Sequence, residues 1–487
     1  MSQHSLGLLR LKKIVYIPCR FPVSSAGICS LLLIPTIVLL LLKGHLSSSR
    51  TERLGTLARL MTEMTLIQSF RGDPQGQAPR LWQDRLGMNL AKDLWRRQGR
   101  GLWWQAWAND GEAYLLLPEI LWPMSVNSSI AFKRLDDVVV IASDGLHRQQ
   151  LLQSLGEGFV HSSAAAQSSL QRFCNSVLQH GPAVSWSPDG LASVSGAMAP
   201  LLQISRYGCL SLRLDRNQLK WQGVVGYRPF GLAPVGIDAS PFQYRPMAIK
   251  SPGRPDSDQA LLNMQVKSMD LLFGSLLSKQ IIQDSLDKNY GINQQLGLRL
   301  ASLPLDLSLA KQRKGPFQAS IQIQLDLPEG SSRWQPVIDT VSQRLEARNF
   351  IKEDNSVVKN DQNTDADFYG LTLWRQPYSD GERVVGGWVW QKQNGKPTRV
   401  GIAIGDSPML NEISNKTINL VHPDVMKMSA DTAGLYRLGL LNGSWPAPVK
   451  QAKLLTMNLS YLRGAKLKKT DWWWMSGQLI LEQASTP

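Results

Sequence analysis

The feature that most constrains this chain is an uncharged stretch at residues 21–42, bounded by Arg20 and Lys43. At about 1.5 Å of rise per residue, a helix of this length crosses a hydrocarbon core of about 30 Å. A helix buried in a globular core rarely stays free of charge on every face. A cleaved signal peptide would need a small-residue cleavage site, which residues 43–46 do not provide. We therefore expect an uncleaved, single-pass transmembrane anchor.

The basic residues beside this stretch bear on its orientation. Lys and Arg occur on both sides of it, so the positive-inside rule does not decide. However, the basic head at residues 1–20 contains no acidic residue and is followed by one long C-terminal part. Such an order is typical of a signal-anchor. We expect the C-terminal part to lie outside the cytoplasm, in a periplasm or lumen.

The net charge of +15 is distributed along the chain rather than gathered in one segment. Residues 1–50 hold six Lys or Arg and no acidic residue, which leaves 15 − 6 = +9 for the remainder. A scattered excess of this kind indicates a solvated basic surface and does not form a nucleic-acid groove. The expected partners are the lipid bilayer, through residues 21–42, and an envelope protein or anionic polymer. No nucleic acid is expected, and the sequence does not predict an oligomeric state.

Two of the four cysteines, Cys174 and Cys209, lie in the C-terminal part, and neither has metal-ligand spacing. Cys174 falls on the apolar stripe of an expected helix at residues 163–180, which favours a free, buried thiol. A disulfide between Cys174 and Cys209 is the alternative in an oxidising compartment.

The first half of the C-terminal part alternates between helical and strand patterns. Apolar residues at helical spacing predict a helix at residues 51–70, and residues 81–117 predict a short helix and at least two strands. Four tryptophans in that segment fit a half-buried sheet face better than a carbohydrate-stacking platform, which stays open as the alternative. A strand at residues 138–141 runs into a helix capped by Asp144, and a hairpin turns at residues 216–217.

The second half follows a segment without periodicity at residues 246–258, which we interpret as a linker. The spacing of apolar residues predicts a long helix at residues 262–281 and another helix at residues 334–347. Alternating patterns predict strands at residues 303–310, 319–327, 367–376, 383–393 and 399–404, and a final hairpin through residues 457–481.

The two halves resemble each other in the order of these expected elements. Gly87 and Gly291 each stand two residues before an asparagine, at the end of a helical stretch, and Asp144 and Asp406 each follow a strand. We interpret this as a tandem duplication. The predicted fold class is α+β, with a transmembrane helix followed by two similar halves built on mainly antiparallel sheets. The expected domains are residues 43–245 and 259–487.

Two segments resemble an uncharacterised bacterial family of membrane-anchored proteins built around a domain of unknown function. One is the stretch at residues 86–95, which runs from leucine and glycine through an acidic residue to tryptophan, and the other is the strand at residues 138–144. This family is frequent in cyanobacteria, and the resemblance covers about half of the chain. It implies an extracytoplasmic protein without an established activity, so no functional residues carry over. The basic segment at residues 96–101 departs from the family's glycine-rich strand.

One motif suggests catalysis. A strand ending in Gly405, Asp406 and Ser407 looks like the nucleophile block of lipase-like esterases, which would need a base such as His422. Capping of a helix by Asp406 or Ser407 is the favoured interpretation. No cofactor, metal or catalytic set is expected, because the histidines are dispersed and phosphate-binding glycine motifs are missing. The sequence therefore predicts a membrane-anchored binding or scaffold protein, with a serine esterase as the alternative.

Overall fold

The chain divides by its internal contacts into two units, Met1–Arg53 and Leu54–Pro487, and every residue described here belongs to the second. The computed structural model describes residues 56–123, 129–157, 169–195, 205–226, 260–271, 279–312, 317–327, 333–355, 367–378, 381–393, 396–405, 424–441, 445, 447–462 and 472–481. None of the helices in these ranges is both long and apolar enough to span a bilayer. The predicted anchor at residues 21–42 and the predicted linker at residues 246–258 lie outside them.

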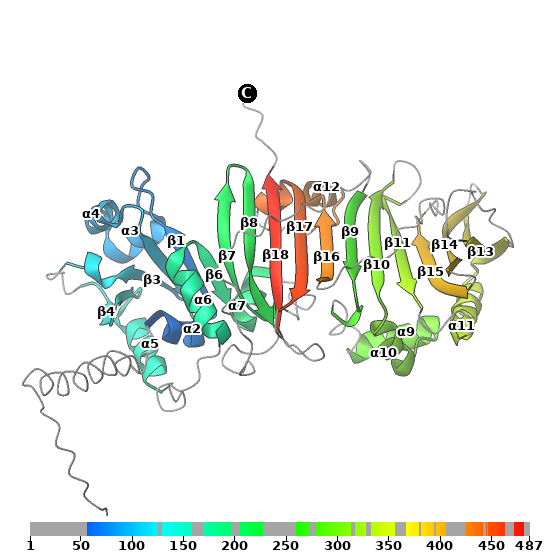
Figure 1. The fold of residues 1–487 in the computed structure, drawn as a ribbon, viewed down its shortest axis with the longest axis horizontal. Coiled ribbons are helices and arrows are strands. Elements are labelled where there is room, and N and C mark those ends of the chain that lie inside the picture. The colour runs from blue at the N-terminus through cyan, green and yellow to red at the C-terminus, as the bar shows by residue number, and fades with distance from the viewer. Residues whose placement is uncertain are drawn as a thin grey trace, which may run out of the picture. The chain divides into compact units, whose positions relative to one another are not determined.

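The second unit has an α+β fold built on one sheet of 18 strands. Neighbouring strands pair antiparallel throughout, which confirms the predicted class and strand direction. From edge to edge the pairings give the order β4, β5, β3, β2, β1, β6, β7, β8, β18, β17, β16, β9, β10, β11, β15, β14, β13 and β12. The part from β7 to β13 can be followed in Figure 1.

The first eight strands belong to the half of the unit before residue 227. They are β1 (Leu66–Arg71), β2 (Leu102–Trp107), β3 (Ala113–Pro118), β4 (Phe132–Leu135), β5 (Val138–Ile141), β6 (Ala183–Trp186), β7 (Tyr207–Asp215) and β8 (Gln218–Gly226). The others are β9 (Ala260–Val266), β10 (Leu305–Lys311), β11 (Ala319–Asp326), β12 (Ile351–Asn355), β13 (Asp367–Tyr378), β14 (Gly381–Gln393), β15 (Lys396–Ile404), β16 (Asp424–Ala430), β17 (Ala452–Tyr461) and β18 (Trp472–Leu481).

The helices lie between these strands along the chain. They are α2 (Thr56–Glu63), α3 (Arg80–Leu86), α4 (Met88–Gln98), the 3-10 helix η1 (Glu119–Leu121), α5 (Gly145–Glu157), α6 (Ser169–His180), α7 (Pro188–Ser195), α9 (Gln280–Tyr290), α10 (Gln294–Ala301), α11 (Gln335–Glu346), α12 (Thr432–Arg437) and α13 (Ala447–Lys450).

Strands β1 to β5 are covered by helices on both faces. On one face Trp82 of α3 and Trp95 of α4 pack on Trp103 and Leu115. On the other face α2, α5 and α6 pack on residues that include Ile67 and Trp104. Strands buried on both faces lose the simple alternation of apolar and polar residues, which explains the continuous apolar run of β5.

From β8 to β15 the sheet has one apolar face. One core lies on this face. It contains Val266, Leu305, Leu325 and Val400, together with Trp334 and side chains of α10 and α11. Many of the intervening positions are polar, such as Gln265 on β9, Asp306 on β10 and Gln324 on β11, so the opposite face is chemically different there. This alternation is the pattern of an antiparallel sheet with a single core face.

Two predicted helices were wrong. The expected helix at residues 51–70 ends at Glu63, because residues 66–71 form β1, which pairs with β2 on one side and β6 on the other. The expected helix at residues 262–281 is wrong at its start, because the chain up to Val266 forms strand β9 between β10 and β16, and α9 begins only at Gln280. Residues 272–278 of this prediction lie outside the described residues. In both places hydrogen bonds to a neighbouring strand on each side outweigh local helical spacing.

The strands predicted at residues 138–141, 303–310, 319–327, 367–376, 383–393 and 399–404, the two hairpins and the helix at residues 334–347 are confirmed within a few residues. The helix predicted at residues 163–180 is confirmed from Ser169 onward.

Candidate functional site

A pocket of about 410 Å³ opens at the ends of two interior strands, where β1 begins and β2 ends. It is lined by residues of β1 and β2, of the turn that follows β2 and of α7: Thr65, Leu66, Trp107, Ala108, Asn109, Gly111 and Asp189. Pockets of this size accommodate small ligands. The pocket therefore combines segments that are distant in the sequence.

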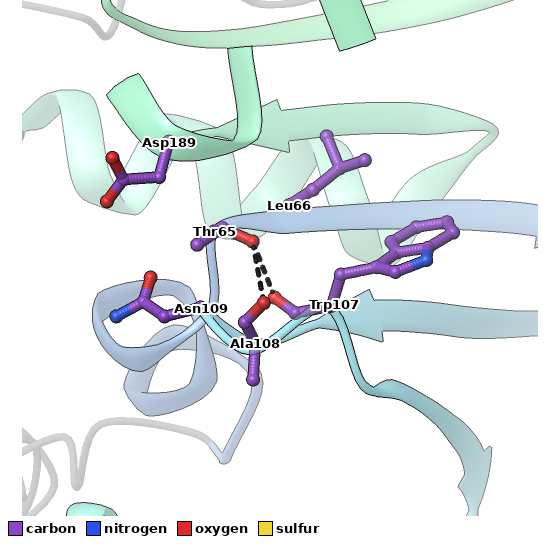
Figure 2. A pocket seen from close by; sticks show the side chains of 7 residues that line it. Thr65, Leu66, Trp107, Ala108, Asn109 and Asp189 are labelled. Carbon is purple, nitrogen blue, oxygen red and sulfur yellow. Dashed lines mark hydrogen bonds between the residues drawn. The ribbon is translucent and has the colours of Figure 1, made fainter. Parts of the chain in front are cut away.

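Hydrogen bonds hold these segments together. The hydroxyl of Thr65 donates to the carbonyl oxygens of Trp107 at 2.9 Å and Ala108 at 3.3 Å, as Figure 2 shows. The backbone N–H of Ser187 donates to the Thr65 carbonyl at 2.8 Å, which fixes the start of α7. A Cβ at Gly190 would lie 2.1 Å from that same carbonyl oxygen, so only glycine allows this approach.

Only two polar side chains border the open side of the pocket. In Figure 2 the carboxylate of Asp189 and the carboxamide of Asn109 lie to one side of Thr65, and the indole ring of Trp107 lies to the other. An exposed carboxylate beside an amide suits an amine or a hydroxylated group and disfavours an anion. The sequence reasoning missed Asp189 and Asn109, because nothing local marks a residue of α7 and a turn residue 80 positions before it as neighbours.

The tryptophans of residues 95–107 divide between core and pocket. Trp95, Trp103 and Trp104 are buried in the core clusters around β2, which confirms the predicted packing role for these three. Trp107 is half-buried and lines the pocket. The fourth tryptophan alone is therefore placed where it can contact a ligand.

The start of α5 carries a cluster of a serine, an aspartate and a histidine. Oδ1 of Asp144 accepts a hydrogen bond from the backbone N–H of His147 at 2.9 Å, which confirms the predicted helix cap. Oδ2 of Asp144 lies 2.8 Å from Nδ1 of His147, and Oγ of Ser143 lies 3.1 Å from the same nitrogen. A catalytic triad places the serine and the carboxylate on opposite ring nitrogens. This cluster is therefore a cap and does not activate Ser143.

Three pKa values change around this cap. The hydrogen bond to Asp144 raises the pKa of His147, and the backbone and side-chain hydrogen bonds from His147 lower the pKa of Asp144. The hydroxyl of Tyr114 donates to the His147 carbonyl at 3.2 Å. Burial, followed by the charges of Asp110, Glu112 and Asp144, raises the pKa of Tyr114 to about 12. Tyr114 is therefore a neutral structural donor at physiological pH.

A band of polar residues in two rows crosses strands β7 to β11. In each row the residues lie directly opposite one another on neighbouring strands. The first row is Ser211, Gln222, Ser476, Asn458, Lys427, Gln265, Asp306 and Gln324, and the second is Arg213, Lys220, Gln478, Thr456, Ser429, Asn263, Ser308 and Gln322. We call these sixteen residues the polar band. At about 4.8 Å between strands, each row extends over roughly 34 Å.

The polar band continues a face that is apolar elsewhere. Beyond Ser211 the same cross-strand line runs through Ala183, Ser69, Trp104 and Leu116, beneath α2, α5 and α6. One face of the sheet is thus covered by helices over its first strands and lined by amides and hydroxyls from β7 to β11.

Within the band some polar groups bond to each other and some have no donor. Nε2 of Gln265 donates to Asp306 at 2.8 Å, and Nδ2 of Asn458 donates to Asp424 at 3.1 Å. The amide oxygens of Gln324 and Asn458 are buried and accept no hydrogen bond from any described residue. Buried acceptors without a donor are uncommon in folded proteins.

The sequence-predicted candidates Ser407 and His422 lie outside the described residues, as does Asp406. In the described ranges, no three His, Cys, Asp or Glu side chains gather in a way that could hold a metal ion. Comparison of the chain with protein-family models, with curated proteins and with solved structures gives no match. A function for this chain therefore has to be inferred from the chemistry of the described residues.

Proposed function

We propose that this chain is a membrane-anchored extracytoplasmic binding or scaffold protein whose polar band takes a hydroxyl-rich polymer of the cell envelope. The observation that carries the proposal is the band itself, with sixteen polar residues and no apolar one across eight strands. Amides, hydroxyls and a few charges along one face of a sheet suit a long ligand that offers many hydrogen-bonding groups and little apolar surface. Arg213, Lys220 and Lys427 also suit a polymer that carries some negative charge.

The anchor at residues 21–42 supports the location. Residues 43–55 separate it from α2, so a unit tethered in this way stays near the bilayer. A reporter enzyme that is active only outside the cytoplasm, fused to the C-terminus, should be active. Activity of a cytoplasm-only reporter at the same position would contradict the location.

The proposal includes a tandem duplication of the described unit. Outward from the centre, the strand order is β8, β7, β6, β1, β2, β3, β5 in one half and β18, β17, β16, β9, β10, β11, β15 in the other. In each half a helix pair, α3 with α4 or α9 with α10, connects the first strand of that half to the second. The joints of the pairs are Gly87 and Gly291, both at positive φ.

The core faces of the two halves support the same relation. Trp103, Leu115 and Val139 lie on the face that α3 and α4 cover, and Leu305, Ile323 and Val400 lie at the corresponding strand positions on the face that α10 contacts. The opposite face differs between the halves: in the first half only β7 and β8 are polar there, whereas in the second half the polar band extends over six strands. We infer that the binding surface spans the junction of a duplicated framework and extends furthest over the second copy.

Binding is tested with the full chain in lipid nanodiscs. The protein is incubated with insoluble peptidoglycan and, separately, with a neutral glucan, and the retained fraction is measured against salt. Replacing Asn263, Gln222 and Gln322 together with alanine should weaken retention at least about tenfold, because several hydrogen bonds of about 1 kcal/mol are lost. The matched control is Asp189→Asn with Asn109→Ala in the pocket, which should bind like the parent. Equal retention of the band variant and the parent would sink the proposal.

A further inference from the structure

Cys174 of α6 and Cys209 of β7 meet inside the protein. Both side chains are completely buried, in a cluster with Leu170, Val224 and Trp472 where α6 packs against the sheet. The two thiols are close enough to hydrogen bond, and both are reduced in this structure. Burial and then the contact with Cys209 raise the pKa of the Cys174 thiol.

We propose that Cys174 and Cys209 form a disulfide when the unit folds in an oxidising compartment, and that this bond ties α6 to β7. The two residues come from different elements that are held in place independently. Strand β7 is fixed between β6 and β8, and α6 is held to the sheet by the hydrogen bond from Trp104 to Leu178. The described residues include no other cysteine that could compete.

The reaction is a thiol–disulfide exchange with an oxidised glutathione or an oxidoreductase disulfide. A thiolate of one cysteine attacks the external disulfide, and the second cysteine then displaces the carrier. One S–S bond forms in the protein and one breaks in the oxidant. Two electrons and two hydrogens pass from the cysteines to the oxidant, which leaves as two thiols.

Burial determines when this exchange takes place. In the folded unit neither sulfur contacts solvent, and a raised pKa keeps the Cys174 thiolate scarce. The bond therefore forms during folding, before α6 covers β7. Once it is formed, the same burial protects it from reductants.

The bond would lie at one end of the polar band. Cys209 is two residues before Ser211 on β7, on the same face of the sheet. A disulfide at this position would fix α6 to β7 where the helix-covered part of that face meets its polar part.

The test uses the full chain with Cys19→Ser and Cys29→Ser, so that only this pair can report. The protein is unfolded in urea and dodecyl maltoside, refolded with reduced and oxidised glutathione, digested without reductant and analysed by mass spectrometry. We expect one species that joins the peptides of Cys174 and Cys209 and is two hydrogens lighter than their sum. Alkylation of both thiols in the refolded protein would overturn the proposal.

A second measurement separates folding from later oxidation. The folded, reduced protein with oxidised glutathione should link at least about tenfold more slowly than the refolding protein, because both sulfurs are buried. The linked form should melt about 5 °C higher than the reduced form. Equal melting temperatures would contradict a bond that fits the native geometry.

Whether Cys174 and Cys209 are linked in cells depends additionally on the proposed extracytoplasmic location. Thiols are trapped with N-ethylmaleimide at lysis, and the same peptides are analysed. A linked pair supports both proposals. Free thiols in cells together with a linked pair after refolding would overturn the extracytoplasmic location and support the disulfide-forming geometry.

Discussion

Trp104 of β2 donates a hydrogen bond from Nε1 to the carbonyl oxygen of Leu178 in α6 at 2.9 Å. Both residues are buried in the core between the sheet and α6. The next residue on the other face, Trp103, is also buried, but its Nε1 has no hydrogen-bond partner among the described residues. Two adjacent tryptophans thus differ in one interaction, which allows that interaction to be measured.

Trp104→Phe should destabilise the unit more than Trp103→Phe, by about 1–2 kcal/mol. The reason is that Trp104→Phe leaves the buried Leu178 carbonyl without its donor, whereas both variants lose similar ring area. The free energy of unfolding is measured in urea by circular dichroism on the full chain in detergent. Equal losses for the two variants would show that the hydrogen bond contributes nothing to stability.

A second prediction concerns the ion pair between Arg399 and Asp326. Nε of Arg399 lies 2.5 Å from Oδ1 of Asp326, and the arginine side chain is only 10% exposed. Asp326→Asn should cost about 2 kcal/mol, because a nearly buried guanidinium loses its counter-charge. Glu353→Gln, which breaks the more exposed pair with Arg375 (31% and 38% exposed side chains), should cost less than about 1 kcal/mol. The comparison is made by urea unfolding at low and high salt.

Much of the strand content was predictable because strands with one core face alternate strictly. Ile321, Gln322, Ile323 and Gln324 show this pattern. The structure packs Ile323 against the core and places the two glutamines in the polar band. The band itself was not predictable. It depends on β9 lying beside β16 and β8 beside β18, and no local pattern encodes pairings between residues so distant in the sequence.

The wrong helix at residues 262–281 has a different physical cause. Leu262 and Val266 are four residues apart, and this spacing places two side chains on one face both in a helix and in a strand. Met264 between them is the residue that distinguishes the two, since it shares their face only in a strand. In the structure Met264 and Val266 lie in the same core, as a strand requires.

The cap at the start of α5 gives a pH-dependent prediction. Because the folded pKa of His147 is raised, the stability it contributes is complete below pH 6.5 and is lost as the pH rises through the folded value. Because the folded pKa of Asp144 is lowered, its contribution is present above pH 3.8 and is lost as the pH falls. The pair therefore stabilises α5 most between these limits. In an NMR titration, Asp144→Asn should move the pKa of His147 back toward 6.5, and an unchanged titration would contradict the contact.

The last prediction compares the glycines at the joints of the two helix pairs. Gly87 has φ 76° and ψ 157°, a region that is open almost only to glycine, and a Cβ there would touch nothing within 4 Å. Gly291 has φ 69° and ψ 18°, and its Cβ would lie 2.4 Å from Cγ2 of Thr340. Each Gly→Ala change should cost about 1–3 kcal/mol of unfolding free energy.

Only the cost at Gly291 should be relieved by a second substitution. Thr340→Ser removes the methyl group that the new Cβ would meet and keeps the hydroxyl that donates to the Pro336 carbonyl at 2.8 Å. Gly291→Ala with Thr340→Ser should therefore recover about 1 kcal/mol relative to Gly291→Ala alone, because the remaining cost is that of a left-handed alanine. Thr340→Ser combined with Gly87→Ala should recover no unfolding free energy, because the cost of Gly87→Ala comes from the backbone conformation alone. Thermal unfolding of the four variants decides the matter, and equal recovery at both joints would show that the contact with Thr340 does not constrain Gly291.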